Sequence, residues 1–507
     1  MTGSEGHLFV VLGRIESVVH DVALIPTSDR FKVRDYWWPL TGEDFERHRP
    51  TRLVVDGHAP SPIDPGLWFV SVGADAANRL AILADRMYEA IHSIVRRGLR
   101  AGVNRAKPLI AVPILGIEGG GLGGHKGTVI KQQLLTCAQL AAELGVDIAI
   151  VTPDRAAYGA AQHLRTKGGG YFDGRLSSSE LVEAKRVGAL AREGQLALFL
   201  GAGVSVSAGL PGWGELVDEL SGGGLVGEVS GLSALDQAQI IELRSMPGEL
   251  GQHVARIISR ADRPGISHAL LAALGAKEVV TTNYDRLYEK SVAAVDERTA
   301  VVMPFEAALA DRPWILKLHG DLEHPEKIVL TRRHFVRFDA LTRPAGSLLQ
   351  SLLMTRHLLI VGVSLNDDNV VRLAHEVQAY REEYGLSGTF GTLLDLEGHR
   401  LREELWRGQL QWLTLGGTDL SARARTLEIF LDATAAFASS NQAWLLDRRF
   451  KDLLTAEEER VADAARRLYA KIPPNSQTWR DLRANLEDLG AVSAYIPAEE
   501  RRRRRRS

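Results

Sequence analysis

Short apolar runs alternate with amphipathic stretches over the first 165 residues of the chain. Runs rich in Val, Ile, Leu and Phe predict strands at 7–13, 21–26, 52–57, 66–73, 108–115 and 147–152. A helical spacing follows at 78–100, where the apolar residues of one face are Leu80, Leu83, Met87, Ile91 and Ile94. The run at 108–115, a glycine-rich loop, a helical pattern at 129–145 and the run at 147–152 predict two parallel strands with a right-handed crossover.

The rest of the chain repeats this alternation after a stretch without periodicity. Residues 166–179 are rich in Gly and Ser and predict a linker, which we extend to 185. Near-continuous apolar runs, typical of sheets covered on both faces, predict strands at 195–201, 277–283, 314–320, 327–331, 357–364 and 391–396. Residues 221–263 predict an insertion beside this sheet, with a helix at 235–246. From 421 onward the pattern is helical until Pro473 and Pro474.

These patterns predict an α/β fold class with two three-layer domains. We expect the first domain at 1–165, the linker at 166–185, a Rossmann-like domain with a parallel sheet at 186–420, and a helical region at 421–507. The length agrees, because 507 residues at roughly 150 per domain correspond to about three units. The composition, with 45% hydrophobic and 24% charged residues, is that of a globular protein.

Cysteine count and charge narrow the chemistry and the compartment. A single cysteine, Cys137, excludes an internal disulfide and a Cys-rich zinc site, so we expect no metal centre and a reducing compartment. We find no uncharged apolar run of 18 residues and no leader pattern, and we expect a cytoplasmic protein without membrane contact. The net charge of −2 becomes −8 without the arginines at 501–506. For that tail we expect solvation, with nucleic-acid contact as the alternative.

The strongest chemical signal is a glycine loop after the apolar run at 195–200. Gly201, Ala202 and Gly203 form a turn where backbone must approach something closely, and small residues lead toward a helix whose free N–H groups attract anions. Phosphate is the expected ligand of this loop. Val206 stands where a Rossmann fingerprint has its third glycine, and no Walker lysine is present. A tight turn without a ligand therefore stays open as the alternative.

Three later fragments place polar residues just past the ends of apolar strands. They are TTNYDRLYEK, LKLHGDLEHP and LLIVGVSLNDDN, and their polar or glycine positions are Asn283, Asp285, His319, Gly320, Gly362, Ser364 and Asn366. The carboxyl ends of parallel strands meet at one edge of a sheet, which is where ligands bind in open α/β folds. We therefore expect all four motifs on one rim.

In this order, the four motifs resemble those of the sirtuin-like (SIR2) family over about residues 195–420. The resemblance implies a Rossmann-like domain that binds NAD and breaks the bond between nicotinamide and ribose. It implies that the NAD-binding residues are Gly201, Ala202, Gly203, Ser205, Gly362, Ser364 and Asn366. It further implies that Asn283 holds the catalytic water or ribose, that Asp285 holds the carboxamide, and that His319 is the general base.

Each of these residues also has an ordinary structural interpretation. His319 is a core histidine with satisfied nitrogens in that case, Asn283 a strand-end Asx turn and Asp285 a helix N-cap. The chain departs from protein-deacylating sirtuins, since one cysteine cannot form their four-cysteine zinc ribbon and Gly212-Trp213-Gly214 follows Pro211 where they have Asp-Phe-Arg. It is more similar to bacterial SIR2-like NADases of antiphage defence. A NAD-dependent protein deacylase and a non-catalytic nucleotide-binding module are the alternatives.

The first domain has a second glycine-dense loop between a strand and a helix. Its members include Gly119, Gly120, Gly121, Gly123 and Gly124, whose backbone N–H groups would suit a diphosphate. A flexible surface loop is the alternative. Residues 7–164 resemble a divergent macro domain, which implies an ADP-ribose-derived or cyclic nucleotide signal, with Asp21 as a candidate adenine contact. A NADase needs an off state, so we expect this signal to favour an active homo-oligomer. The C-terminal helices supply oligomer contacts or pack on the sheet.

Overall fold

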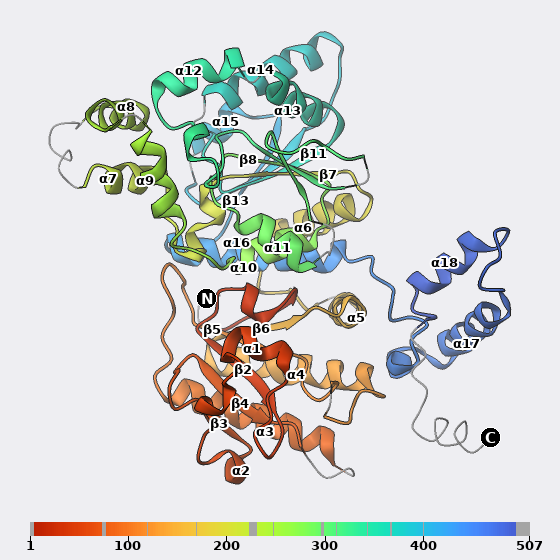
Figure 1. Cartoon of the computed structure of the whole chain (residues 1–507). Helices are drawn as coiled ribbons and strands as arrows, with labels where there is room; N and C mark the ends of the chain where they lie inside the picture. The colour runs from red at the N-terminus through yellow and green to blue at the C-terminus, as the bar shows by residue number, and fades with distance from the viewer. Residues whose placement is uncertain are drawn as a thin grey trace.

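In the part of the chain that the computed structural model describes, the strands form two sheets, each in a unit of its own (Figure 1). The residues that it describes are 5–73, 78–118, 120–168, 170–222, 231–246, 248–295, 299–310, 312–341, 343–365, 368–398 and 400–492. Both sheets have helices on their faces, so the expected α/β class with two such units is confirmed. None of the helices in the described ranges is long and apolar enough to cross a membrane.

The first sheet has six strands in the order β1-β6-β5-β2-β4-β3. Their bounds are Leu8–Leu12, Asp147–Thr152, Leu109–Val112, Val22–Thr27, Leu67–Ser71 and His58–Pro60. All pairs are parallel except β3 with β4. The helix α4 (Lys126–Leu144) connects β5 to β6, which confirms the expected parallel crossover unit. β1, β4, β5 and β6 are fully buried, as their near-continuous apolar sequences require.

One expected strand of this unit is a helix. Residues 52–57 form a single turn, α2 (Leu53–Asp56), rather than a strand. Gly57 ends it with a φ of 72°, a left-handed conformation that glycine adopts without strain. Leu53 is buried while Val55 is 79% exposed, so the apolar run does not belong to a buried strand. The longer helices α3 (Arg79–Arg96) and α5 (Arg155–Thr166) flank the sheet.

The second sheet has seven strands, all parallel, in the order β13-β12-β11-β7-β8-β10-β9. Their bounds are Leu410–Thr414, Gly391–Asp395, His357–Val361, Leu196–Leu200, Glu278–Thr281, Trp314–Lys317 and Val301–Met303. The strand expected at 327–331 is wrong: a short turn, Pro325–Lys327, precedes irregular chain there. That segment is apolar because Ile328 and Leu330 are buried against helices beside the sheet, not because it joins the ladder.

Three helices form a side cluster next to the second sheet (Figure 1). They are α7 (Trp213–Leu220), α8 (Ala234–Arg244) and α9 (Glu249–Ile258). Their buried side chains, among them Leu216, Ile241 and Val254, pack on each other and on Tyr284 in the loop after β8. The helix expected at 235–246 corresponds to α8, whereas α7 precedes the expected insertion at 221–263. Residues 223–230 and 247 of that insertion lie outside the described residues.

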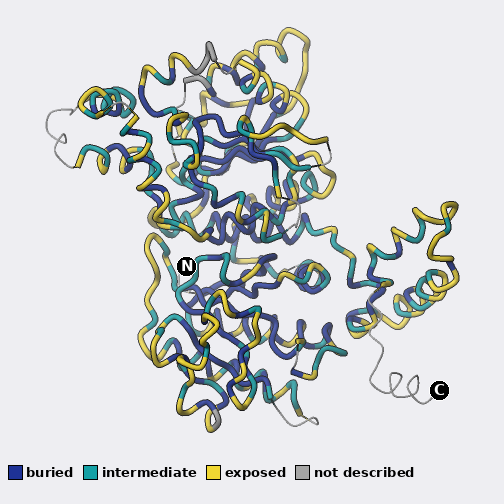
Figure 2. The backbone as a smooth tube through the Cα atoms, in the orientation of Figure 1, coloured by how far each residue is buried: buried dark blue, intermediate teal, exposed yellow. Residues whose placement is uncertain are grey.

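A buried helix, α16 (Leu420–Ala438), lies between the two units (Figures 1 and 2). Asp432 in it is fully enclosed and lies 2.7 Å from Nε2 of His7, and Arg165 donates to both of its oxygens. Since His7 and Arg165 belong to the first unit, these contacts hold that unit against α16. The expected linker is packed here too: Phe172 is 2% exposed, and α6 (Ser178–Arg192) begins within it and packs on α16.

Candidate active site

A hollow with a cavity volume of about 50 Å³ lies at the carboxyl ends of β7 and β8. Its lining residues are Ala202, Ser205, Leu210, Pro211, Gly212, Trp213, Leu216, Ile258, Thr282, Asn283, Tyr284 and Asp285. Four of the residues proposed from the sequence, Ala202, Ser205, Asn283 and Asp285, are therefore brought together. β7 and β8 are parallel neighbours, so their carboxyl ends meet at this edge as expected.

Three glycines bring the loops after β7 and β11 into backbone contact behind this hollow. The N–H of Gly203 donates to the carbonyl oxygen of Gly362 over 3.1 Å. A Cβ at Gly201 would lie 2.4 Å from that oxygen, and one at Gly203 would lie 2.7 Å from the Cα of Gly362. Gly362 itself has a φ of 69°. Packing of one loop on the other thus explains these glycines without a ligand.

The chain after the glycine loop differs from the expected helix. Two short 3-10 turns, Ala202–Val204 and Val206–Ala208, come first, and α7 begins only at Trp213. Ser364 is exposed at the rim and its carbonyl oxygen accepts from Arg402. Asn366 lies outside the described residues. The helix N-terminus expected at the loop is therefore displaced along the chain.

The Ser205 hydroxyl is at the centre of a buried hydrogen-bond cluster. It donates to Oδ2 of Asp285 over 2.8 Å, and Nδ2 of Asn283 donates to it over 3.3 Å. Nε2 of His268, on α10 (Ile266–Ala273), lies 3.2 Å from the same oxygen. A hydroxyl has one proton, which Asp285 receives, so Nε2 of His268 must be the donor. Ser205 therefore has no proton left for a ligand and instead orients its neighbours.

Asn283 and Asp285 each combine a structural bond with access to the hollow. Oδ1 of Asp285 accepts from the N–H of Leu287 at the start of α11 (Leu287–Val295), as the helix-cap interpretation predicts. Nδ2 of Asn283 also donates to the carbonyl oxygen of Gly201 over 3.1 Å. Oδ1 of Asn283 is buried and has no hydrogen-bond partner among the described atoms. An orphaned amide oxygen at a pocket wall is suited to accept from a bound hydroxyl or water.

His319 is near the hollow without lining it. The side chain follows β10 and is 4% exposed, and its ring lies edge-on to Trp213 and Phe335 at centroid distances of 6.3 and 4.9 Å. Trp213 lines the hollow, so His319 lies beside a residue of its wall. His268 is enclosed more deeply, and burial lowers its pKa, which keeps the ring neutral near pH 7.

The structure separates the residues of the site proposed in the first unit. Gly120, Gly121, Gly123 and Gly124 follow β5 at the carboxyl edge of the sheet, and Gly119 lies outside the described residues. Asp21 precedes β2, and its Oδ2 accepts from the N–H of Leu109 over 2.7 Å at the start of β5. Because β2 and β5 are parallel, Asp21 lies at the opposite edge. The expected grouping of Asp21 with the glycine loop is therefore wrong.

Sequence reasoning missed three residues that shape the candidate site. His268 lies in an apolar helical stretch outside the four motifs, and Trp213 was noted only as a departure from a motif. Lys317 ends a strand of apolar residues, and a charged residue inside such a run was a signal that something must pair with it. The described part of the chain contains no group of three or more His, Cys, Asp or Glu residues that could hold a metal ion.

Several known proteins are similar to part of this chain. A family model described as "SIR2-like domain" matches residues 277–400. A protein named "NAD(+) hydrolase ThsA" from Bacillus cereus (strain MSX-D12) is 29% identical over 196 residues, which are 38% of this chain and 41% of that protein. A protein of the same name from Enterococcus faecium is 28% identical, over 39% of this chain and 43% of that protein.

The comparisons include two further proteins. "Defense-associated sirtuin 2" from Bacillus subtilis is 27% identical over 39% of this chain and 21% of that protein. A solved structure titled "Structural Basis for the Mechanism and Regulation of Sir2 Enzymes" is 15% identical with a TM-score of 0.31, over 50% of this chain and 96% of that one. The chain spans less than half the length of the curated relatives named here. The matched residues run from the start of β8 past β12, and the chain contains a SIR2-like domain.

Proposed function

We propose that this chain is a NAD hydrolase that cleaves the bond between nicotinamide and ribose. The observation that carries the proposal is the hollow at the ends of β7 and β8, where Asn283 presents an unpartnered amide oxygen beside Asp285. The names of relatives from Bacillus cereus and Enterococcus faecium, both "NAD(+) hydrolase ThsA", support it. Gly201, Ala202, Gly203, Ser205, Gly362, Ser364 and Asn366 are the residues that we propose surround the dinucleotide, with Ser205 acting through its neighbours.

The chemistry requires few groups from the protein. The nicotinamide nitrogen leaves with the electron pair of its bond to ribose C1′, positive charge develops on the ribose, and a water oxygen forms the new bond to C1′. The water proton passes to a base, for which we propose His319, and the products are nicotinamide, ADP-ribose and a proton. Asn283 would hold the water or the ribose hydroxyls with its amide oxygen. Asp285 would accept from the carboxamide N–H₂, since each of its oxygens keeps a free lone pair.

A protein deacylase is the second candidate function. Its support is the family resemblance alone, because the chain has one cysteine, Cys137, and that residue is buried in the first unit. A four-cysteine zinc ribbon is therefore excluded by the sequence. We propose hydrolysis with water as the principal reaction and depletion of NAD in defence as its biological role. The name "Defense-associated sirtuin 2" of the Bacillus subtilis relative supports that role.

We also propose that a nucleotide derived from NAD binds the glycine loop of the first unit and regulates the hydrolase. The contacts between the units support this idea. Nδ2 of Asn104 donates to the carbonyl oxygen of Val206, next to Ser205, over 3.2 Å. The N–H of Val19 donates to the carbonyl oxygen of Pro264, just before α10 with His268, over 2.8 Å. Asn104 precedes β5 and the glycine loop follows β5, so this strand connects the contact with Val206 to the proposed nucleotide site.

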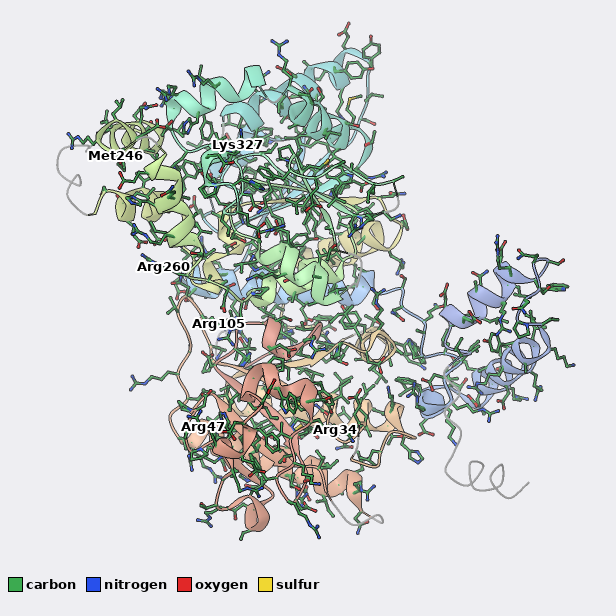
Figure 3. All side chains as sticks on the ribbon, viewed as in Figure 1. Arg34, Arg47, Arg105, Met246, Arg260 and Lys327 are labelled. Atoms are coloured by element: carbon green, nitrogen blue, oxygen red, sulfur yellow. The ribbon has the colours of Figure 1, made fainter. Side chains whose placement is uncertain are left out.

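The same surface carries ion pairs. Arg105 extends from the first unit toward α16, where its Nη1 lies 3.0 Å from Oε1 of Glu428 (Figure 3). Arg425 of α16 pairs with Asp147 at the start of β6 over 2.7 Å. The partners are almost fully enclosed, so a shift of one unit against the other would break bonds that water cannot replace at once. Such a surface has discrete arrangements rather than a continuous range.

The experiment that tests the proposed function measures nicotinamide and ADP-ribose released from NAD by the purified full chain. We expect equal amounts of both products, and a loss of at least about 100-fold in His319→Ala with an unchanged circular dichroism spectrum. Adding ADP-ribose or cyclic ADP-ribose tests regulation, and Asn104→Asp, which replaces the donor by an acceptor, should weaken any response. Turnover that appears only with an acyl-lysine peptide would favour the deacylase. Binding of NAD without any turnover would favour the non-catalytic module.

A further inference from the structure

Lys317 is a buried charge that the proposed chemistry does not use. It is the last residue of β10, two positions before His319, and its side chain is 0% exposed. It does not line the hollow. An unpaired ammonium in such a place would cost several kcal/mol, so its partners must compensate for the lost water.

The ammonium has partners from three separate segments. Nζ lies 2.9 Å from Oε1 of Glu289 on α11 and 2.8 Å from Oδ2 of Asp321 in the loop after β10. It also donates to the carbonyl oxygens of Tyr284 and Asp285 in the loop after β8. The two carbonyl oxygens accept hydrogen bonds from the ammonium, and the two carboxylate oxygens are its ion-pair partners. One side chain therefore connects the loop that carries Asn283, the helix that follows it and the loop that carries His319.

The electrostatic balance keeps this lysine ionised. Burial lowers its pKa, but the charges of Glu289, Asp321 and Asp285 outweigh burial and raise the pKa above its ordinary value. Burial raises the pKa of Glu289 against the opposing effect of the lysine. Arg286, whose Nε lies 3.7 Å from Oδ2 of Asp321, adds a second positive charge at the edge of the cluster. The cluster thus contains a fixed cation rather than a group that exchanges its proton.

We propose that Lys317 is a positioning residue that fixes the Asn283–Asp285 loop against the His319 loop. Register supports this role, because Lys317 is paired with Thr281, the last residue of β8. The N–H of Leu318 donates to the carbonyl oxygen of Thr281, and beyond these residues the two loops leave the ladder. One further backbone hydrogen bond joins them, from the N–H of Leu322 to the carbonyl oxygen of Tyr284 over 3.0 Å, and Lys317 adds the side-chain contacts. The expected effect of Lys317 on turnover rests on the proposed NAD hydrolysis. Its effect on the position of the two loops does not depend on that function.

The first variant is Lys317→Met, which keeps the length of the side chain and removes the charge. We expect kcat for NAD to fall by about 30-fold or more while KM changes less than about threefold, because loop misplacement acts on the transition state. Lys317→Arg keeps the charge and should recover part of kcat. The matched control is Lys290→Met on the same helix α11, where an exposed lysine donates to the carbonyl oxygen of Asp262. That control should leave both constants unchanged.

The second readout is hydrogen exchange, which does not depend on activity. In Lys317→Met the amides of 282–287 and 318–322 should exchange faster, with those of the first sheet unchanged. If this variant does not fold, Lys317→Met with Glu289→Gln removes a charge of each sign and is measured in its place. Wild-type exchange at 282–287, or a uniform rise over the whole chain, would overturn the inference. A wild type that releases no nicotinamide would remove the proposed function, while the exchange result would still decide the role of Lys317.

Discussion

The two glycine-rich loops of this chain look alike in sequence and differ in their surroundings. Each follows a buried parallel strand, β5 in the first sheet and β7 in the second. The loop after β7 borders a hollow with amide, carboxylate and hydroxyl groups, including Asn283 and Asp285. A hollow between α3 and α4, beside Leu115 after β5, is lined mainly by apolar side chains, and its polar members are Gln132 and Gln133. Glycine density therefore predicts close backbone packing, and the neighbouring strand ends decide whether chemistry follows.

The loop after β5 is also covered by another part of the chain. Phe450 and Leu453, from the short 3-10 helix Arg448–Leu453, pack where a Cβ at Gly127 would stand. Oδ2 of Asp452 accepts from the Thr128 hydroxyl over 2.7 Å in the first turn of α4. A carboxylate already lies at the helix start that we expect to attract an anion. The segment Arg448–Leu453 thus lies against the start of α4, where a nucleotide bound at the glycine loop would have to fit.

The largest expected effect concerns the polar wall of the second loop. Asn283→Ala should lower NAD hydrolysis by about 100-fold or more, because it removes the amide that we place on the water or ribose. The unfolding free energy should change by only about 1 kcal/mol, the usual value of the hydrogen bonds lost. Turnover and urea unfolding of the purified variant measure the two effects. NAD hydrolysis by Asn283→Ala at close to the wild-type rate would show that the polar residues beside the loop after β7 do not distinguish it from the loop after β5.

Glycine contact should matter next. Gly203→Ala places a Cβ 2.7 Å from the Cα of Gly362, where neither backbone can move freely, and should cost about 3 kcal/mol. Gly214→Ala, in the first turn of α7 with open space around the new methyl, is the control and should stabilise slightly. Thermal unfolding compares the two variants. Equal midpoints would contradict the close packing of the loops after β7 and β11.

Gln133 holds the start of the glycine loop after β5 through two side-chain hydrogen bonds to the backbone, and we assign it no catalytic role. Oε1 of Gln133 accepts from the N–H of Leu115 over 3.0 Å, and its Nε2 donates to the carbonyl oxygen of Pro113 over 2.7 Å. Gln133→Leu leaves both backbone groups unsatisfied and should lower the unfolding free energy by about 2 kcal/mol. NAD turnover should stay unchanged in the absence of an added nucleotide. A loss of basal turnover would show that the loops are coupled even without a signal.

Histidines at the amino-terminal edges of the two sheets, away from the glycine loops, predict a pH dependence of stability. His20 precedes β2 and His357 begins β11, and burial, together with the nearby charge of Arg263 or Arg186, lowers the pKa of each to about 4. Below pH 6.5 the unfolded chain binds protons that the folded chain does not, so stability falls from there toward pH 4. His20→Gln and His357→Gln should each reduce the slope by about 1 kcal/mol per pH unit. An unchanged slope in urea unfolding at pH 6 and 5 would contradict neutral buried rings.

The smallest effect concerns the cover of the first loop. Asp452→Asn should lower stability by only about 0.5 kcal/mol, because the pair with Thr128 is exposed. If a nucleotide competes with this carboxylate, ADP-ribose should bind the variant more tightly in calorimetry. Weaker binding of ADP-ribose would indicate that Asp452 supports the loop after β5. The view that this carboxylate keeps an anion away from that loop would then be wrong.

Much of the fold could be predicted because buried parallel strands have near-continuous apolar sequences. The turn at 53–56 and the packed segment at 327–331 defeated the same rule, since apolar residues also line helix clusters such as that of α7, α8 and α9. α16 was recognised as a helix but not as the buried element between the units, because its partners His7 and Arg165 are more than 260 residues away.

The candidate site could be predicted as far as strand ends determine it. Asn283, Asp285 and Ser205 lie together because β7 and β8 are parallel neighbours. The sequence could not show that Ser205 is saturated by three side chains, since one of them, His268, comes from a separate helix. It also could not separate Asp21 from the glycine loop, because strand direction and register were needed to place them at opposite edges.

The central claim is that the hollow beside Asn283 hydrolyses NAD. The most direct measurement is the time course of NAD loss by the purified full chain, with ADP-ribose or cyclic ADP-ribose present or absent and with products separated by chromatography. We predict that nicotinamide and ADP-ribose appear in equal amounts without any acyl peptide, and that Asn283→Ala forms neither. NAD that stays intact under all these conditions, or equal turnover in Asn283→Ala, would contradict it.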